Sequence, residues 1–393
     1  PFISAEAIKN NVIDFSLQRG FISKEDHRKY SRKYKPRRSD IYLIKSGATT
    51  GNVAMVNTDQ EFNIWSPLAV IRSDEKKLDK KLMFYNLLAD HFRKQIELGW
   101  SFGTQENIGM GIIENLYVVT PRENEQKTIS LFLEKKIPEI DDLIAKNKKL
   151  IELEEEKRVA LIDHAVTKGL DSYVKLKYSG VEWVGEIPEG WKVVPLTKFL
   201  VNIADYRGKT PEKTEEGVFL VTGKNIKNGI INYNLSQEYV HKEDYGKIMQ
   251  RGKPKKGDLL FTTEAPLGEV ANVDNPYIAL AQRIIKMRAR ENVLDNYFLK
   301  YYIMTKTFQG FLQSLATGST ALGIKANKLC YLKLILPPKP EQVPIVKYLD
   351  KHIVNIDKTI HKISKNIELL EEYKQSLIHH VVTGKVDVRE VAA

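Results

Sequence analysis

The stretch that decides the fold is EQKTISLFLEKKIPEIDDLIAKNKKLIELEEEKRVALIDHAVTK, residues 125–168. It recurs in altered form as EQVPIVKYLDKHIVNIDKTIHKISKNIELLEEYKQSLIHHVVTG, residues 341–384. Residues 116–169 align without a gap to residues 332–385, and 23 of these 54 pairs are identical. The period of 216 residues is far longer than the roughly 20 to 50 residues of a solenoid repeat. The pattern therefore indicates a duplicated half-protein with a pseudo-twofold internal repeat.

Both copies have the pattern of a long amphipathic helix. Apolar residues recur mostly at steps of three and four, with polar residues between them. Each copy begins just after a proline and ends near a glycine, which are typical start and stop signals. About 37 helical residues would span roughly 55 Å. A helix of this length with an apolar seam needs a partner, and the other copy is the obvious candidate. The seam residues include Ile129, Leu133, Ile137 and Ile140 in one copy and Ile345, Leu349, Ile353 and Ile356 in the other.

The blocks that precede the two helices differ more from each other. Short aliphatic and β-branched runs bounded by Gly, Pro, Asn and Asp predict strands. A helical stretch is expected late in each block, at residues 81–98 and 296–314. Each block is therefore predicted to be an α+β domain. Residues 187–218 have no counterpart before Pro1, so we expect the first half to be truncated at its N-terminus. The expected strands include residues 40–45, 68–72, 116–119, 258–262 and 332–336.

We call the two repeated long-helix segments the constant blocks and the segments that precede them the variable blocks. The net charge of +11 lies in the variable blocks. The constant blocks are neutral, with ten basic and ten acidic residues at 126–175 and eight of each at 341–393. Residues 1–125 carry 19 Lys and Arg against 16 Asp and Glu, and residues 176–340 carry 24 against 16. Lys and Arg that contact phosphates supply much of the affinity of proteins for nucleic acids. The charge distribution thus suggests a polyanionic partner for the variable blocks.

Composition indicates a globular chain with 42% hydrophobic residues. No stretch approaches 18 consecutive apolar residues, so we expect no membrane partner. The single cysteine, Cys330, excludes an internal disulfide and fits a reducing cytoplasm. As a small apolar side chain, Cys330 is expected to be buried.

The motifs of several enzyme classes are missing. The sequence has no glycine-rich cofactor loop and no Asn/Asp-Pro-Pro-aromatic element, which a methyltransferase needs. Residues 318–325 resemble a phosphate loop only loosely, because Ile324 stands where the lysine should be. The eight histidines show no zinc-ligand spacing. Asp258 with Glu264 could be nuclease carboxylates, but Asp40, the counterpart of Asp258, has no such partner. We therefore predict no catalytic residue, no cofactor and no metal.

Polar, basic loops remain as the chemistry of the variable blocks. Arg pairs bidentately with guanine, Asn and Gln pair with adenine, and Ser, Thr and Lys hold phosphates. Loops at residues 101–107 and 317–320 correspond across the repeat, which favours a shared role. The candidate contacts of the first block are Lys35, Arg37, Arg38, Lys45, Ser46, Thr49, Thr50, Ser101, Gly103, Thr104, Gln105 and Asn107. Those of the second block are Arg207, Lys209, Thr210, Lys224, Asn225, Lys227, Lys253, Lys255, Gln282, Arg283, Thr317, Ser319, Thr320 and Lys325.

These features together resemble a known family. They include IPEGWKVVPL at residues 187–196, RGKTP at 207–211 with NIKNG at 225–229, and KGDLL at 256–260. Pro121 and Pro337, each followed by a Glu-Gln pair, open the long helices. Over essentially its whole length the chain is similar to the specificity (S) subunits of type I restriction-modification systems.

The resemblance implies a fold, a function and partners. Two α+β target recognition domains would be joined by two long antiparallel coiled-coil helices, and each domain would read one half of a bipartite target in double-stranded DNA. The subunit would not itself be catalytic. Two methyltransferase (modification) subunits would dock on it, and restriction subunits would join for cleavage. The neutral helices and the domain flanks would be the docking surface, and the helix pair would set the spacer.

The expected domains follow from the repeat and the resemblance. They are recognition domain 1 at 1–120, helix 1 at 121–170, a connector at 171–186, recognition domain 2 at 187–338, helix 2 at 339–385 and a tail at 386–393. Two other functions stay open from the residues alone. One is a stand-alone DNA methyltransferase or nuclease, and the other is a coiled-coil protein that binds RNA or has a structural role.

Overall fold

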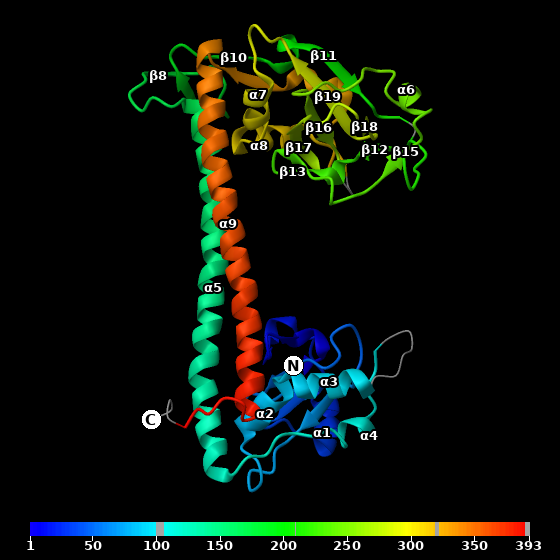
Figure 1. Cartoon of the computed structure of the whole chain (residues 1–393), viewed down its shortest axis with the longest axis vertical. Coiled ribbons are helices and arrows are strands. Elements are labelled where there is room, and N and C mark those ends of the chain that lie inside the picture. The colour runs from blue at the N-terminus through cyan, green and yellow to red at the C-terminus, as the bar shows by residue number, and fades with distance from the viewer. Residues whose placement is uncertain (100–105, 209, 319–321, 390–393) are drawn as a thin grey trace. The chain divides into compact units, whose positions relative to one another are not determined.

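The two repeated segments are the longest helices of the structure. The computed structural model describes residues 1–99, 106–208, 210–318 and 322–389. The long helices are α5, Glu123–Lys168, and α9, Lys339–Val382 (Figure 1). They contain 46 and 44 residues, or about 69 and 66 Å at 1.5 Å per residue. Both exceed the expected 37 residues, because polar turns extend each helix beyond its apolar seam.

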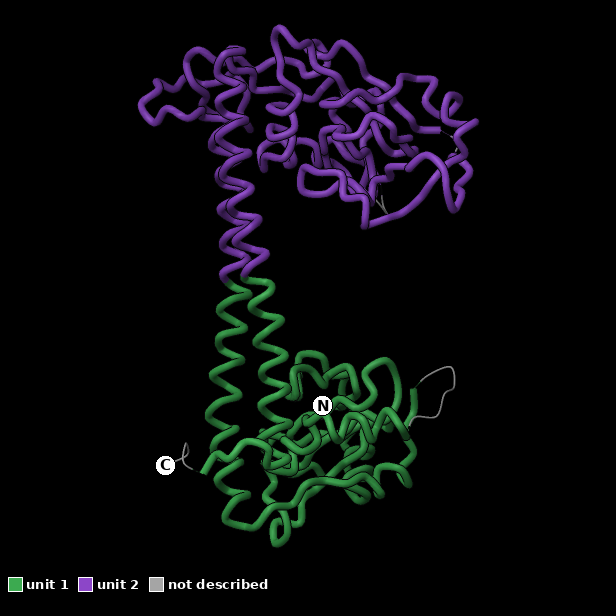
Figure 2. Tube along the Cα trace, viewed as in Figure 1, with its two compact units in different colours: residues 1–149, 363–393 green, residues 150–362 purple. Residues whose placement is uncertain are grey.

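Contacts divide the chain into two compact units, and each long helix contributes to both. Unit 1 consists of residues 1–149 and 363–393, and unit 2 of residues 150–362 (Figure 2). Within unit 1, Lys374 of α9 bonds to Asp141 of α5 at 2.5 Å. Within unit 2, Arg158 of α5 pairs with Asp357 of α9. Most of the predicted seam is buried, with Ile353 partly buried, and the helices pair antiparallel.

A buried glutamine near the start of each long helix bonds to the backbone of the segment just before a shorter helix of the same unit. We call this joint the glutamine latch. Gln126 Oε1 accepts the backbone N–H of Asp79 at 2.7 Å, and its Nε2 donates to the carbonyls of Lys77 and Pro121. In unit 2, Gln342 repeats all three bonds with the backbone of Asp295, Val293 and Pro337. Both glutamines are buried. The repeated Glu-Gln dipeptide is therefore a structural joint.

We expect the latch to contribute measurably to stability. Replacing Gln342 with alanine leaves a buried N–H and buried carbonyls without partners, which should destabilise unit 2 by about 1 to 3 kcal/mol. Denaturant unfolding of the full chain measures the loss. Gln313→Ala, at an exposed site on α8 (Lys306–Leu315), is the matched control and should change stability by less than about 0.5 kcal/mol. Equal stability of the two variants would contradict the latch.

Unit 1 is built around a three-stranded antiparallel sheet in the order β5-β4-β7. Buried Ile41, Leu43 and Val53 on one face pack against Phe92 and Ile96 of α3. The helices are α1 Lys24–Lys33, α2 Lys80–Leu88, α3 Asp90–Gly99 and α4 Met110–Ile113. The strands are β1 Phe2–Ile3, β2 Ile8–Lys9, β3 Val12–Ile13, β4 Ile41–Ile44, β5 Val53–Met55, β6 Asn63–Ile64 and β7 Leu68–Ile71.

Unit 2 holds a four-stranded antiparallel sheet in the order β11-β19-β16-β17 and a three-stranded sheet in the order β15-β12-β18. Its α7 packs against β16 and β17. The helices are α6 Tyr245–Ile248, α7 Asn296–Ile303 and α8. The strands are β8 Leu176–Tyr178, β9 Glu186–Pro188, β10 Lys192–Pro195, β11 Leu200–Asp205, β12 Val218–Val221, β13 Ile226–Lys227, β14 Ile230–Ile231, β15 Tyr239–Val240, β16 Leu259–Thr263, β17 Leu267–Asn272, β18 Ala279–Leu280, β19 Ile284–Ala289 and β20 Lys333–Leu336.

Trp191 fastens the segment at 187–195 to both long helices within unit 2. Its indole N–H donates to Glu341 of α9 at 2.9 Å, and its ring lies against Gly169, just after α5. Gly169 has φ +82°, and a Cβ there would approach the ring to 3.3 Å. Trp191 is 1% exposed. The segment continues into β10, which pairs with β20, so the end of the recognition domain is tied to both helices.

Three expectations about local structure are wrong. Residues 116–119 form no strand, whereas their counterpart β20 does, because the described part of unit 1 offers no equivalent of β10 to pair with. The expected helices at 81–98 and 296–314 are each two helices, broken at Ala89 and at Met304–Thr305. Cys330 is exposed instead of buried, because it lies in a surface 3-10 turn.

The expected connector is partly folded onto unit 2. β8 pairs with β9, and Trp183 between them stacks on Phe311 of α8 with ring centroids 4.3 Å apart. Among the helices that the structure describes, none combines the length and apolar character that crossing a membrane requires.

Candidate nucleic-acid interface

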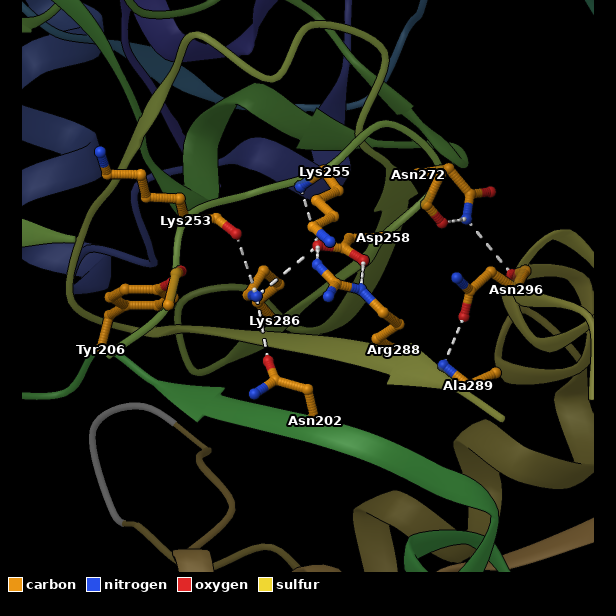
Figure 3. Close-up of polar contacts among 12 residues, drawn as sticks. Asn202, Tyr206, Lys253, Lys255, Asp258, Asn272, Lys286, Arg288, Ala289 and Asn296 are labelled. Carbon is orange, nitrogen blue, oxygen red and sulfur yellow. Dashed lines mark hydrogen bonds and ion pairs between the residues drawn. The ribbon is translucent and has the colours of Figure 1, made fainter. Parts of the chain in front are cut away.

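A buried carboxylate fixes the basic loop that precedes β16 (Figure 3). Asp258 is 1% exposed. Arg288 of β19 donates to both of its oxygens at 2.6 Å, and the backbone N–H of Lys255 donates at 2.9 Å. The hydrogen bonds to Asp258 raise the pKa of Arg288. Because a bidentate pair is geometrically specific, this anchor fixes the basic loop, residues 251–257, at the backbone of Lys255.

Lys286 of β19 also stabilises this loop. Its side chain is 1% exposed, and its ammonium donates to Asn202 Oδ1 at 3.0 Å and to the carbonyl of Lys253 at 3.3 Å. Asp258 lies 3.6 Å away. Burial lowers the pKa of Lys286, and the nearby charge of Asp258 opposes that change. The three contacts tie β11, the basic loop and β16 together (Figure 3).

Unit 1 has an equivalent aspartate–arginine anchor in which a different third side chain contacts the aspartate. Arg72 donates to both oxygens of Asp40 at 2.6 and 2.8 Å, and the backbone N–H of Arg37 donates at 2.9 Å. The hydroxyl of Tyr34 donates at 2.6 Å in addition. Burial would raise the pKa of Asp40, but the bonds from Arg72 and Tyr34 hold it below its ordinary value. The aspartate, the arginine and the loop N–H thus repeat, while a tyrosine takes the place of the buried lysine.

Several predicted contacts gather around two hollows of unit 2. The larger hollow, about 370 Å³, is lined by Arg207, Thr210 and Gln282, among others. The smaller one, about 210 Å³, shares Thr210 and Gln282 and adds Lys224 and Arg283. Gln282 Nε2 donates to Thr210 Oγ1 at 2.7 Å, at the rim common to both. Segments far apart in the sequence thus bring amide, hydroxyl and cationic groups to one surface.

Four predicted cations already have acidic partners within their own unit. Pairs between exposed side chains contribute about 0 to 1 kcal/mol, so a phosphate can take the place of the acid at little cost. Only the Arg207 pair is mostly buried, and Arg207 also donates to the carbonyl of Ile324. The pairs are Lys35 with Glu61, Arg38 with Asp59, Arg207 with Asp205 and Arg283 with Glu264.

Most of the remaining described candidates lie on loops. In unit 1, Ser46 and Asn107 form a β-bridge, which places the loop at 45–50 beside residues 106–108. Exposed candidates on loops include Arg37, Thr49, Lys253, Lys255, Thr317 and Lys325, and Lys45 is half-buried. Lys227 is exposed and ends strand β13.

Two candidates are buried and serve the fold. Asn225 is 0% exposed. Its Oδ1 accepts from the backbone and hydroxyl of Thr222, and its Nδ2 donates to the carbonyls of Asn232 and Ser236. The expectation that Asn225 contacts a base is therefore wrong. Thr50 is 6% exposed, and its hydroxyl donates to the carbonyl of residue 47 at 2.7 Å, so it too stabilises its own loop.

Seven candidates lie outside the described residues. They are Ser101, Gly103, Thr104, Gln105, Lys209, Ser319 and Thr320.

Sequence reasoning missed two sets of cations. Arg251 lines the larger hollow of unit 2 and donates to the carbonyl of Arg207 at 2.8 Å. Helix α1 of unit 1 carries exposed Arg and Lys residues that no candidate list included. The run of basic residues at 24–38 was the available signal.

Within the described ranges, no cluster of His, Cys, Asp or Glu could hold a metal ion. The nuclease reading of Asp258 and Glu264 also loses its basis. Asp258 is bonded to Arg288 and Glu264 to Arg283 at 2.7 Å, so each carboxylate is neutralised by an arginine.

The comparison with protein families decides the classification. Residues 1–155 and 188–369 match the sequence model of the family described as "Type I restriction modification DNA specificity domain". The chain belongs to this family. Members are the non-catalytic DNA-recognition components of restriction-modification systems, and this type I specificity subunit has two recognition domains. The resemblance inferred from the motifs is confirmed.

Relatives cover most of the chain. The MjaVIII specificity subunit of Methanocaldococcus jannaschii is 26% identical over 90% of this chain and 80% of its own length. The putative MjaX specificity subunit of the same organism is also 26% identical, over 99% of this chain and 88% of its own length. The EcoKI specificity subunit of Escherichia coli matches about half of the chain at 20% identity.

Solved structures share the fold of this specificity subunit. One comes from a study of complex assembly and conformational transition of the type I R-M system, with a TM-score of 0.72 and 17% identity over 97% of this chain and 90% of that one. The HsdS subunit of Thermoanaerobacter tengcongensis has a TM-score of 0.50 and 18% identity over 90% and 82% of the two chains. Two α+β recognition domains with two long helices, as predicted, are thus confirmed.

Proposed function

We propose that each recognition domain reads one half of a bipartite target in double-stranded DNA. The observation that carries this proposal is the repeated Asp-Arg anchor, in which Asp40 and Asp258 each hold a basic loop over a sheet. Both loops keep one basic pattern, KPRR at residues 35–38 and KPKK at residues 253–256, so each domain presents matching cations to the phosphates of its half-site. Base-specific contacts come from side chains such as Gln282 and Arg283, and phosphate contacts come from the surrounding lysines.

The partners proposed for the subunit are two methyltransferase subunits, with restriction subunits added for cleavage. Specificity subunits of type I systems work with methylase and restriction subunits and DNA. The constant blocks are electrically neutral, and both helices keep exposed apolar side chains at equivalent positions, Leu153 and Leu369. Two matching surfaces suit two copies of one partner. The proposed place of action is the cytoplasm, which suits a chain with a single cysteine.

The direct test combines methylation mapping with DNA binding. Methylated sites in cells that carry the chain with its modification subunits should share one split sequence. The purified complex should then bind a duplex with that sequence more tightly than a scrambled duplex or a single-stranded RNA of equal length. A complex that prefers RNA, or that methylates without a common sequence, would refute the proposal. Methyl transfer by the chain alone would favour the enzyme alternative.

We propose further that the helix pair sets the spacer between half-sites. Deleting residues 147–153 and 363–369 removes two turns from each helix in register with the seam, or about 10 Å. At 3.4 Å per base pair, the accepted spacer should shorten by about three base pairs while the half-site bases stay the same. Methylation-site mapping reads both quantities.

The control for the deletion keeps the helix length. Substituting exposed polar residues of the same two segments by alanine should leave the spacer unchanged. The ruler hypothesis fails if the shortened variant methylates sites with the original spacer.

A further inference from the structure

Helix α1 presents a face of unpaired cations. Its exposed residues Arg28, Lys29, Arg32 and Lys33 make no ion pair, hydrogen bond or ring contact within the described part of the chain. At 100° per residue, the four side chains cover an arc of about 140° on one side of the helix. The cations of the neighbouring loop differ, because Lys35 and Arg38 each pair with an acid.

The opposite face of α1 fastens the helix to unit 1. His27 contacts Asn63 Oδ1 at 2.6 Å, and Tyr30 stacks on Phe2 with ring centroids 6.1 Å apart. Just past the last turn, Tyr34 donates to the Asp40 anchor. Ser23 caps the first turn by accepting the N–H of residue 26 at 3.0 Å. The helix is thus held at both ends with its cationic side outward.

The charge of unit 1 is concentrated at this helix and the loop after it. Residues 24–38 contain eight Lys and Arg against two acidic residues. Residues 1–125 as a whole carry 19 against 16, so the remainder of the block has 11 against 14 and is net acidic. The basic excess that pointed to a polyanion is therefore a local feature.

The like charges on this face repel one another, while Arg32 and Lys33 in the last turn are favourable to the helix dipole. Arg28 with Arg32 and Lys29 with Lys33 are like-charge pairs at i,i+4, each of which destabilises a helix by about 0.2 to 0.5 kcal/mol. No apolar residue of α1 is buried to compensate. Four exposed cations on one face, with no partner among the described residues, are complementary to a row of phosphates.

We propose that α1 is a DNA-binding element of unit 1 beside the anchored loop and that Arg28, Lys29, Arg32 and Lys33 contact backbone phosphates of the duplex. This inference rests on the proposed function. A ten-residue helix is about 15 Å long, and the major groove of B-DNA, about 12 Å wide, admits a helix. Side chains that point to both walls of the groove reach phosphates from there.

Unit 2 binds its half-site by other means. The segment aligned with α1, residues 242–251, contains only the four-residue helix α6. Arg251 within it donates to backbone carbonyls of its own unit. The contact surface of unit 2 is instead the pair of hollows around Gln282. The two recognition domains therefore differ in how they hold DNA as well as in which bases they read.

The test measures the salt dependence of DNA binding by the full chain assembled with its modification subunits. The probe is a duplex that carries the target identified by methylation mapping. The variant R28Q/K29Q/R32Q/K33Q removes four cations and keeps good helix formers. Each lost phosphate contact should reduce the slope of log Kobs against log salt by about 0.9, so the variant should be less steep by about 3 to 4.

The matched control removes four cations elsewhere in unit 1. Three lysines near the start of α2, Lys77, Lys80 and Lys81, each pair with an acidic residue. The variant K76Q/K77Q/K80Q/K81Q should change the slope by less than about 1. If the α1 variant does not fold, R28Q/R32Q and K29Q/K33Q each replace it, and each should reduce the slope by about 2.

The outcomes separate this inference from the function on which it rests. Duplex binding by the original chain with an unchanged slope in the α1 variants overturns the role of α1 and leaves the proposed function standing. Absence of sequence-specific duplex binding by the original chain overturns the proposed function itself. Equal loss in the α1 and control variants shows a general charge effect and also overturns the inference.

Discussion

Replacing Asp258 with alanine is expected to destabilise unit 2 by about 3 to 5 kcal/mol, because the change leaves two buried or half-buried cations without their counter-charge. Arg288 would lose both of its carboxylate bonds. Lys286, already held by burial in a state of lowered pKa, would lose the charge that offsets its desolvation. Denaturant unfolding of the full chain, followed through a probe in unit 2, measures the loss.

Two further variants test whether the stability loss comes from the buried position of Asp258 or would follow the removal of any acidic residue. Glu264→Ala removes an exposed partner of Arg283 and should cost less than about 1 kcal/mol. Lys286→Met in the Asp258→Ala background removes one stranded cation and should restore part of the lost stability. A loss for Asp258→Ala no larger than that for Glu264→Ala would show that the anchor is dispensable.

The second large effect is expected at Trp191. Trp191→Ala should destabilise unit 2 by about 3 to 5 kcal/mol, the usual range for truncating a buried aromatic residue. The ring fills the space beside Gly169 and packs in the core that also contains Ile162 and Val166 of α5. Its loss removes one of the contacts that join the ends of both long helices to the recognition domain. Thermal and denaturant unfolding report the change.

Conservative and matched variants define what Trp191 contributes. Trp191→Phe keeps most of the apolar contact and loses the hydrogen bond to Glu341, so about 1 to 3 kcal/mol should be lost. Trp183→Ala removes a half-buried ring that stacks on Phe311 and should cost less than Trp191→Ala. If both alanine variants unfold alike, the joint is not specific to Trp191.

Periodicity and repetition were sufficient to predict the large features of the fold. The apolar seam required long helices, and the second copy supplied the partner, so pairing through Ile137 or Leu349 followed from the pattern. Strands at 41–44 and 259–263 followed from short aliphatic runs between turn residues. These signals are local or come directly from the duplication, and no long-range geometry is needed to recognise them.

Predictions that depended on tertiary partners were wrong. Residues 116–119 have the composition of a strand, but a strand needs a neighbouring strand to pair with. Their counterpart β20 pairs with β10, and the described part of unit 1 has no equivalent of β10. Asn225 is the residue type that reads adenine, yet its amide closes a capping box in the interior. The cations of α1 have no repeat signal, because the aligned segment of the other half holds only the four-residue helix α6. Nothing in the residue type alone separates an arginine that anchors a sheet from one that faces outward.

The glutamine latches have a consequence for how such proteins can change. Gln126 and Gln342 bond only to backbone groups of the domain that each helix adjoins. A joint of this kind accepts almost any side chains on the other side, provided that the backbone path is kept. A recognition domain can therefore be exchanged for another, or drift toward a new target, without redesign of the helices that carry it. The latch thus allows one recognition domain to replace another during evolution.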